Sequence, residues 1–296
     1  MRKWKQAALG LLAILAVGIL SACGGNQGQA TNGQMGSSDT TNESKDDVVI
    51  GLAISTLNNP FFVDLEAGAK EAAEAAGANL VVLDAQDDPA RQVSQIEDLV
   101  TQGVDAIVIN PTDGDAVVPA IEKANQANIP VITVDRAATG GKVATHIASD
   151  NVAGGRMAGE YIIDLLGGEG KVVELEGIPG TSAARDRGQG FNEVIGSADG
   201  IEVVARQPAD FDRAKGMSVM ENILQAQPEI DAVFAHNDEM ALGALEAIKA
   251  SGRSGIKVIG FDGTPDAVAA VKAGELVSVP GGGGNRRAVG PEPGGP

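Results

Sequence analysis

From residue 48 onward, short apolar segments alternate with longer segments that have an amphipathic, helical pattern. Most of the short segments are nearly continuous apolar runs, which are typical of strands covered by helices on both faces. The pattern predicts strands over residues 48–55, 80–83, 106–110, 131–135, 144–147, 172–176, 203–206, 232–236 and 258–262. This regular alternation of strands and helices favours right-handed βαβ units and open parallel sheets.

The predicted elements occupy about 230 residues, which is large for a single sheet, so we expect two lobes. The alternation is interrupted once, where the predicted strands at 131–135 and 144–147 follow each other without a helix. We place the passage between lobes there, with a first lobe over 47–149 and a second over 150–279. The expected fold is α/β, with two Rossmann-like lobes that each contain a parallel sheet and a cleft between them at the carboxyl ends of the strands.

The N-terminus has the pattern of an export signal. Three basic residues within the first five precede an apolar run over 7–20, which is too short to cross a bilayer comfortably. The following LSAC motif is similar to a bacterial lipobox, and its Cys23 is the only cysteine of the chain. We therefore predict a signal peptide over 1–22 and an extracytoplasmic protein anchored to the cell membrane by a lipid on Cys23. Residues 24–46 are mostly Gly, Ser, Asn, Gln and Thr, so the segment 23–46 is expected to be a lipidated cysteine with a flexible tether.

The charge balance excludes one class of partner. The chain has 22 Lys and Arg against 40 Asp and Glu, for a formal net charge of −18. Removal of the three basic residues of the signal leaves 19 against 40, a net charge of −21. Such an acidic chain is repelled by DNA and RNA, so no nucleic-acid partner is expected.

Polar and aromatic side chains follow most of the predicted strands, at the edge where open α/β sheets bind ligands. Each residue taken alone is also explained by ordinary turn or helix-cap chemistry. Together they combine amides, carboxylates and guanidinium groups, which engage sugar hydroxyls, with aromatic rings that pack on the C–H faces of a sugar. At these strand ends, Asp135 and Asp262 would accept from hydroxyls, Arg136 and Arg187 would donate to them, and Asn59, Asn110 and Asn237 would do either, while Phe61, Phe62 and Phe211 stand beside them.

Catalytic and cofactor motifs are missing from the sequence. The Gly-rich EGIPGTSAARDRG segment lacks the Gly-Lys-Ser/Thr of a P-loop and is no G-x-G-x-x-G motif. The sequence has no G-x-S-x-G elbow. Its two histidines, His146 and His236, are not at metal-ligand spacing. We therefore expect a binding protein rather than an enzyme, with no cofactor and no metal.

Eight segments along the chain carry a family resemblance: STLNNPFF, INPTD, ANQANIPVITVDR, HIASDN, GTSAARDRGQGF, QPADFDR, HNDEMALGAL and GFDGTPD. From about residue 48 to residue 276 the chain resembles the ribose-binding members of the type I periplasmic binding protein family, which serve bacterial ABC sugar importers. The resemblance implies two lobes joined by hinge strands that close around the sugar. It also implies that Phe62 and Phe211 sandwich the sugar ring, while Phe61 completes the apolar wall. The full set of ligand-binding residues that the resemblance implies is Asn59, Phe61, Phe62, Asn110, Asp135, Arg136, Arg187, Phe211, Asn237 and Asp262.

The function implied by the resemblance is that of a monomeric lipoprotein that binds D-ribose and delivers it to the membrane permease of an ABC importer. A chemoreceptor is a further partner of this kind of protein. Alternatives left open are another small sugar, such as allose or a furanosyl signal molecule, and an enzyme acting on a sugar phosphate. A repressor core of the same fold would need an N-terminal helix-turn-helix, where this chain has a signal peptide.

The C-terminus departs from the family pattern. After AGELVSV the resemblance implies a last hinge crossing, a helix and a final strand in the first lobe. Residues 280–296 instead read PGGGGNRRAVGPEPGGP, a Gly/Pro tract that we expect to form none of these elements and to be disordered. Gly282 stands about where the family places a ligand-binding Gln, so the resemblance implies the loss of one sugar contact.

Overall fold

In a computed structural model of the 296-residue chain, the structure describes residues 48–279 and 288–289. The predicted signal peptide, Cys23, the tether and most of the Gly/Pro tail lie outside these residues. Within the described part, no helix combines the length and apolar character needed to cross a membrane.

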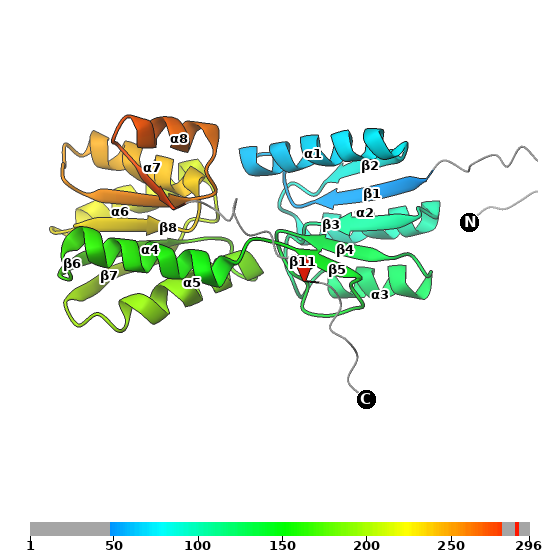
Figure 1. Ribbon diagram of the computed structural model, residues 1–296, viewed down its shortest axis with the longest axis horizontal. Helices are drawn as coiled ribbons and strands as arrows, with labels where there is room; N and C mark the ends of the chain where they lie inside the picture. Colours follow the sequence, from blue (N-terminus) through cyan, green and yellow to red (C-terminus); the bar gives the residue numbers. More distant parts are fainter. Residues whose placement is uncertain (1–47, 280–287, 290–296) are drawn as a thin grey trace, which may run out of the picture. The chain divides into compact units, whose positions relative to one another are not determined.

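The first sheet has the strand order β11-β5-β4-β3-β1-β2 (Figure 1). Strands β1 to β5 pair in parallel, and β11 runs antiparallel to β5. The strands are β1 (Val49–Ile54), β2 (Asn79–Asp84), β3 (Ala106–Ile109), β4 (Val131–Val134), β5 (Thr145–Ile147) and β11 (Ala288–Val289). The helices between them are α1 (Pro60–Ala76), α2 (Pro89–Gln102) and α3 (Val118–Gln126).

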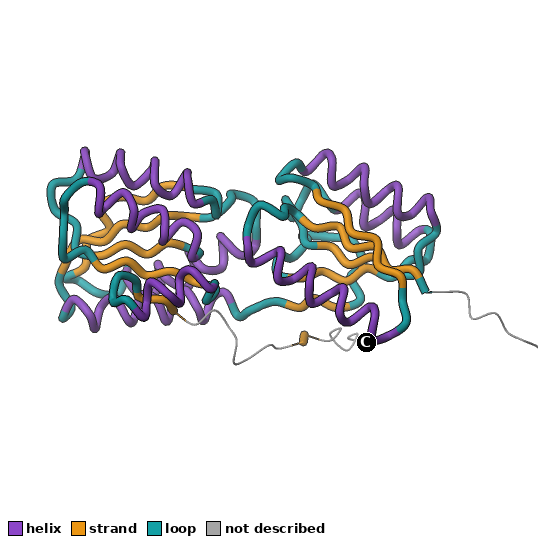
Figure 2. Tube along the Cα trace, turned by 90° about the horizontal axis from the view of Figure 1, so that it is seen from above, coloured by secondary structure: helices purple, strands orange, loops and turns teal. Residues whose placement is uncertain are grey.

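The second sheet has the order β10-β9-β8-β6-β7, with every pair parallel. Its strands are β6 (Gly170–Glu176), β7 (Ile201–Pro208), β8 (Ala232–Ala235), β9 (Lys257–Phe261) and β10 (Val277–Val279). The helices are α4 (Asn151–Leu166), α5 (Ser182–Ile195), α6 (Arg213–Ala226), α7 (Asp238–Ala250) and α8 (Pro265–Lys272). In each sheet, helices lie on both sides of the strands (Figure 2).

The prediction of an α/β fold with two parallel sheets is confirmed. Every predicted strand is present with ends that agree within about two residues, and β4 and β5 follow each other without a helix. From the β2 edge, the first sheet has the order β2-β1-β3-β4-β5, and from the β7 edge the second sheet has the equivalent order β7-β6-β8-β9-β10. This is an order of doubly wound folds, which bind ligands at the carboxyl ends of their strands. The expectation that the tail forms no strand of the first lobe is wrong for Ala288 and Val289, because these residues pair with Ile147 and His146 of β5.

The cores of the two sheets are covered differently. In the second sheet, β8 is buried at every position, as its continuous apolar run predicts. In the first sheet, β3 and β4 alternate between buried and half-buried residues, so one face of these strands is fully covered and the other is covered in part. The buried set, which includes Ile107, Ile109 and Val131, faces a core shared with residues of α2 and α3. The other face of these two strands is less completely covered by the described residues.

Candidate functional site

One cavity, with about 260 Å³ of space between its atoms, collects the residues predicted to bind ligand. Nine of the ten predicted residues line it, and Ala183 is the one further lining residue. The lining residues are Asn59, Phe61, Phe62, Asp135, Arg136, Ala183, Arg187, Phe211, Asn237 and Asp262.

The topology of the sheets explains why these residues meet. Asn59 follows β1, Asp135 follows β4, and Asp262 directly follows β9. Parallel strands of a sheet all end at the same edge, so residues far apart in the sequence come together there. The cavity draws on residues that follow strands of both sheets.

The two asparagines act as helix caps and also face the site. The side-chain oxygen of Asn59 accepts a hydrogen bond from the N–H of Phe61, and that of Asn237 accepts one from the N–H of Met240. Their amide Nδ2 atoms donate to the carbonyl oxygen of Phe211, at 3.5 Å from Asn59 and 3.2 Å from Asn237. Helix capping and a place in the site are therefore compatible, because each amide uses its oxygen for one and its nitrogen for the other.

The backbone of the site is strained at three lining residues. Asp135, Phe211 and Asp262 have φ values of 60°, 58° and 123°. Positive φ is uncommon for residues other than glycine and costs about 1–3 kcal/mol, so it persists only where surrounding contacts impose it. This strain turns the side chains that follow β4, β7 and β9 toward the cavity that they line.

Two buried ion pairs dominate the electrostatics of the cavity. Arg136 Nε lies 3.7 Å from an oxygen of Asp135, and Arg187 Nη1 lies 3.5 Å from an oxygen of Asp262. Burial lowers the pKa of Arg136, although Asp135 opposes the shift. Burial also raises the pKa of Asp262 well above its usual value, although Arg187 opposes this.

Hydrogen-bonding capacity is left over at this site. Arg136 is 2% exposed, and its buried Nε has no hydrogen-bond partner among the described residues. An unpartnered buried donor costs about 1–3 kcal/mol, and a ligand with an acceptor oxygen would recover part of this. Arg136 lines the same cavity as Asp135 and Asp262, whose carboxylates accept hydrogen bonds.

The aromatic side chains surround the Arg136 guanidinium. Its central carbon lies 5.1 Å from the centre of the Phe62 ring and 5.4 Å from that of the Phe211 ring. Phe61 packs edge-on against Phe62, with ring centres 5.2 Å apart. Arg187 lies 3.7 Å from the Phe261 ring centre and 5.7 Å from that of Phe211. The site thus combines flat apolar faces with cations held between them.

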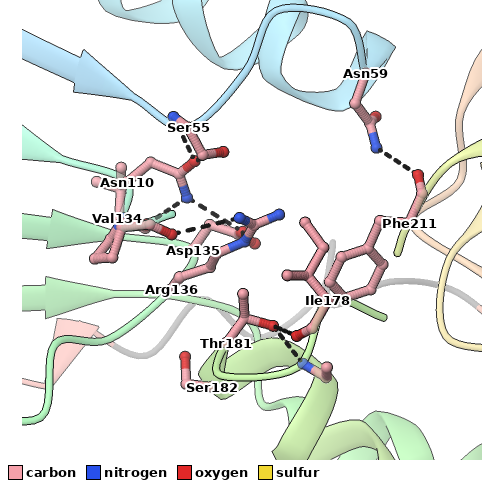
Figure 3. A network of polar contacts seen from close by, with 12 residues as sticks. Ser55, Asn59, Asn110, Val134, Asp135, Arg136, Ile178, Thr181, Ser182 and Phe211 are labelled. Carbon is pink, nitrogen blue, oxygen red and sulfur yellow. Dashed lines mark hydrogen bonds and ion pairs between the residues drawn. The ribbon is translucent and has the colours of Figure 1, made fainter. Parts of the chain in front are cut away.

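Asn110 is the predicted site residue that does not line the cavity. It is fully buried, and its Oδ1 accepts from the N–H and hydroxyl of Ser55 (Figure 3). Its Nδ2 donates to the carbonyl oxygen of Val134 at 3.1 Å and to an Asp135 oxygen at 3.4 Å. Asn110 therefore supports the Asp135 side chain by this hydrogen bond without lining the cavity itself. The sequence indicated its place at a strand end and not the direction of its side chain.

Ala183 is a lining residue that was not predicted from the sequence; it lies in the first turn of α5 and carries no polar group that could have marked it. A second cavity, with about 650 Å³ of space between its atoms, adjoins the first and shares four lining residues with it, Asn59, Phe62, Arg136 and Phe211.

The described residues contain no cluster of His, Cys, Asp or Glu that could hold a metal ion.

Comparison with known proteins gives relatives over most of the chain. Residues 50–279 match the periplasmic binding protein domain family. The chain is 56% identical over 229 residues to the ribose import binding protein RbsB of Escherichia coli, covering 77% of each chain. It is 55% identical over 232 residues to the protein of the same name from Bacillus subtilis, covering 78% of this chain and 75% of the relative.

Solved structures agree with this relationship. The myo-inositol binding protein of Caulobacter, solved with myo-inositol, matches with a TM-score of 0.76 at 32% identity and covers 78% of this chain and 80% of its own. A periplasmic solute binding protein from Actinobacillus succinogenes, solved with D-allose, matches with a TM-score of 0.73 at 33% identity, covering 78% and 84%. The domain match spans residues 50–279, the sequence identity to the two RbsB relatives is 55–56%, and the solved structures share the fold. The chain therefore belongs to the periplasmic binding protein family.

Proposed function

We propose that this protein binds D-ribose and delivers it to an ABC importer. The observation that carries the proposal is that nine predicted residues from six separate segments of the chain line one cavity, with both partners of two ion pairs among them. The relatives that are 54–56% identical are named ribose import binding proteins, which favours ribose over other sugars.

The lining residues match the chemistry of a pentose. Asp135 and Asp262 accept hydrogen bonds from sugar hydroxyls, and Arg136 and Arg187 donate to hydroxyl and ring oxygens. Arg136 Nε is a buried donor at the cavity that has no hydrogen-bond partner among the described residues. Phe62 and Phe211 supply apolar faces for the C–H groups of the ring.

Transport requires that the site open and close. We propose that the lobes, residues 47–149 and 150–279, close on the sugar by hinge motion. The partner would be the membrane permease of the importer, and a chemoreceptor is a second candidate partner. We propose that the protein acts as a monomeric carrier without a cofactor and that it is not an enzyme, because the relatives it resembles are named binding proteins.

The protein is proposed to act outside the cytoplasm, held at the cell membrane by a lipid on Cys23. Metabolic labelling with a radioactive fatty acid tests the anchor. The wild-type chain should incorporate label and remain with the membrane fraction, while Cys23→Ala should incorporate none. Equal labelling of both forms would contradict this assignment.

Another small sugar is the second candidate ligand. Structural relatives at 32–33% identity were solved with D-allose and myo-inositol, so the fold accepts several polyols. The larger adjoining cavity would give room to a ligand of more than five carbons.

Isothermal titration calorimetry of the purified chain tests the function. We expect a saturable isotherm with D-ribose and none with D-glucose. Allose and myo-inositol are titrated in the same way, and tighter binding of either would replace ribose as the assigned ligand. If none of these sugars gives a binding isotherm, the proposed function is contradicted.

A further inference from the structure

A buried acid–histidine pair lies next to the cavity in sequence, since His236 directly precedes the lining residue Asn237, but it does not line the cavity. Glu174 on β6 and His236, directly after β8, are both fully buried, and Glu174 Oε1 lies 3.0 Å from His236 Nε2. Arg206 on β7 donates to the other carboxylate oxygen of Glu174 at 2.5 Å, and Asn192 on α5 donates to the same carboxylate. Burial alone would raise the pKa of Glu174, but the contacts with His236 and Arg206 outweigh it and lower the pKa.

The hydrogen bonds of His236 define which ring nitrogen carries a hydrogen. The backbone N–H of Gly177 lies 3.3 Å from His236 Nδ1. A backbone N–H can only donate, so Nδ1 is the unprotonated nitrogen and Nε2 carries the hydrogen that it donates to Glu174. The hydrogen bond to Glu174 thus selects the tautomer in which Nδ1 can accept from the Gly177 N–H.

Gly177 in turn supports the ring of Phe211. A Cβ atom built on Gly177 would lie 2.0 Å from Cζ of Phe211 and 2.4 Å from both of its Cε atoms. The ring therefore rests directly on the Gly177 backbone, and a shift of that backbone moves the ring. Phe211 is one of the cavity-lining residues with positive φ, and its carbonyl accepts from Asn59 and Asn237.

The same histidine also holds a cation of the cavity. The carbonyl oxygen of His236 accepts a hydrogen bond of 2.6 Å from Arg187 Nη1, while Asn151 accepts from Arg187 Nε at 2.9 Å. The ring has little freedom, because a Cβ on Gly188 would lie 3.2 Å from its Cε1 atom. A tilt of the ring would strain the Gly177 contact.

We propose that His236, oriented by Glu174, is a positioning residue for ligand binding, which seats Phe211 through Gly177 and Arg187 through its own carbonyl. This inference rests on the proposed function, since it concerns the same sugar site. It assigns a role to two buried ionisable residues that do not touch the cavity.

Two substitutions separate the two ring nitrogens. In His236→Asn the amide oxygen takes the place of Nδ1 and accepts from Gly177, whereas in His236→Gln the amide nitrogen takes the place of Nε2 and the Gly177 N–H loses its acceptor. We expect the ribose Kd to rise about tenfold in His236→Gln and to stay within about threefold of wild type in His236→Asn. Equal affinities in both variants, or equal losses, would overturn the inference. If His236→Gln does not fold, a tenfold loss in His236→Asn would overturn it.

A readout without ligand keeps this test apart from that of the function. In the ligand-free protein, NMR hydrogen exchange of the Gly177 amide should speed up in His236→Gln and remain protected in His236→Asn. Unchanged protection in His236→Gln would overturn the positioning role even if no sugar binds, whereas a silent wild-type titration would overturn only the function. The chain's other histidine, His146 on β5, provides the control. His146→Asn and His146→Gln should leave the ribose Kd and Gly177 exchange unchanged.

Discussion

Replacement of Asp262 by asparagine tests the buried charge of the cavity. The side chain is 7% exposed and lies 3.5 Å from Arg187, and its φ of 123° is uncommon for asparagine and aspartate alike, so the substitution leaves the backbone strain in place. Asp262→Asn therefore removes the charge and preserves the shape. At an effective dielectric constant of ~20, the attraction over this distance is about 5 kcal/mol, and the desolvation of a buried ion costs several kcal/mol. Because the two terms oppose each other, and Arg187 keeps its bonds to His236 and Asn151, we expect the free energy of unfolding at pH 7 to change by less than about 2 kcal/mol.

Ligand affinity should respond more strongly than stability. A hydrogen bond to a charged group contributes about 1.5–3 kcal/mol, so the ribose Kd of Asp262→Asn should rise by about 10-fold to 150-fold in calorimetry. A Kd within threefold of wild type, measured on a folded variant, would refute the assignment of Asp262 to the sugar site.

The pH dependence of stability gives a second check on the same residue. The pKa of Asp262 is raised in the folded protein above the usual 3.8, so the folded state binds more protons than the unfolded state between the two values. The free energy of unfolding then falls as the pH rises through this window, and the contribution is lost from 3.8 upward. Asp262→Asn should remove this decrease. Urea denaturation of the ligand-free protein over a series of pH values measures it, and parallel curves for the two proteins would contradict the prediction.

Three further substitutions test the packing and support of the site. Phe211→Ala should lower the free energy of unfolding by about 3–5 kcal/mol, because it removes a ring that is 7% exposed, and it should also weaken ribose binding. An unchanged midpoint in urea denaturation would contradict the stability prediction. Gly155→Ala places a Cβ 2.0 Å from the carbonyl oxygen of Arg187, so α4 and α5 must separate. The free energy of unfolding in urea should fall by about 1–3 kcal/mol. The matched control is Gly68→Ala on α1, which meets no atom within 4 Å and should not destabilise the protein. Asn110→Ala should weaken ribose binding although Asn110 does not line the cavity, since Asp135 loses its support, and an unchanged Kd in calorimetry would contradict that role.

Much of the fold follows from the pattern of apolar residues. Short β-rich runs such as residues 232–236 and 258–262 predict strands because a fully buried parallel strand needs apolar side chains on both faces. The absence of a helix between β4 and β5 is also visible in the sequence, since residues 136–143 lack any helical pattern. Residues at strand ends predict the place of the site, because topology brings all these ends to one edge.

The direction of each side chain was decided by the tertiary structure alone. Asn110 and Asp135 both stand at strand ends, but Asn110 is drawn inward by Ser55 and Val134, while the positive φ of Asp135 turns its carboxylate to the cavity. Coverage of β3 and β4 depends on which helices pack against them: the apolar runs predict cover on both faces, and the described residues leave alternate positions half-buried. The contact of β11 with β5 also arises from the tertiary fold, because a two-residue strand in a Gly/Pro tract has no local signal. His236 illustrates the same limit: its sequence neighbours mark a strand end, and only the fold brings Glu174 and Gly177 to opposite nitrogens of its ring.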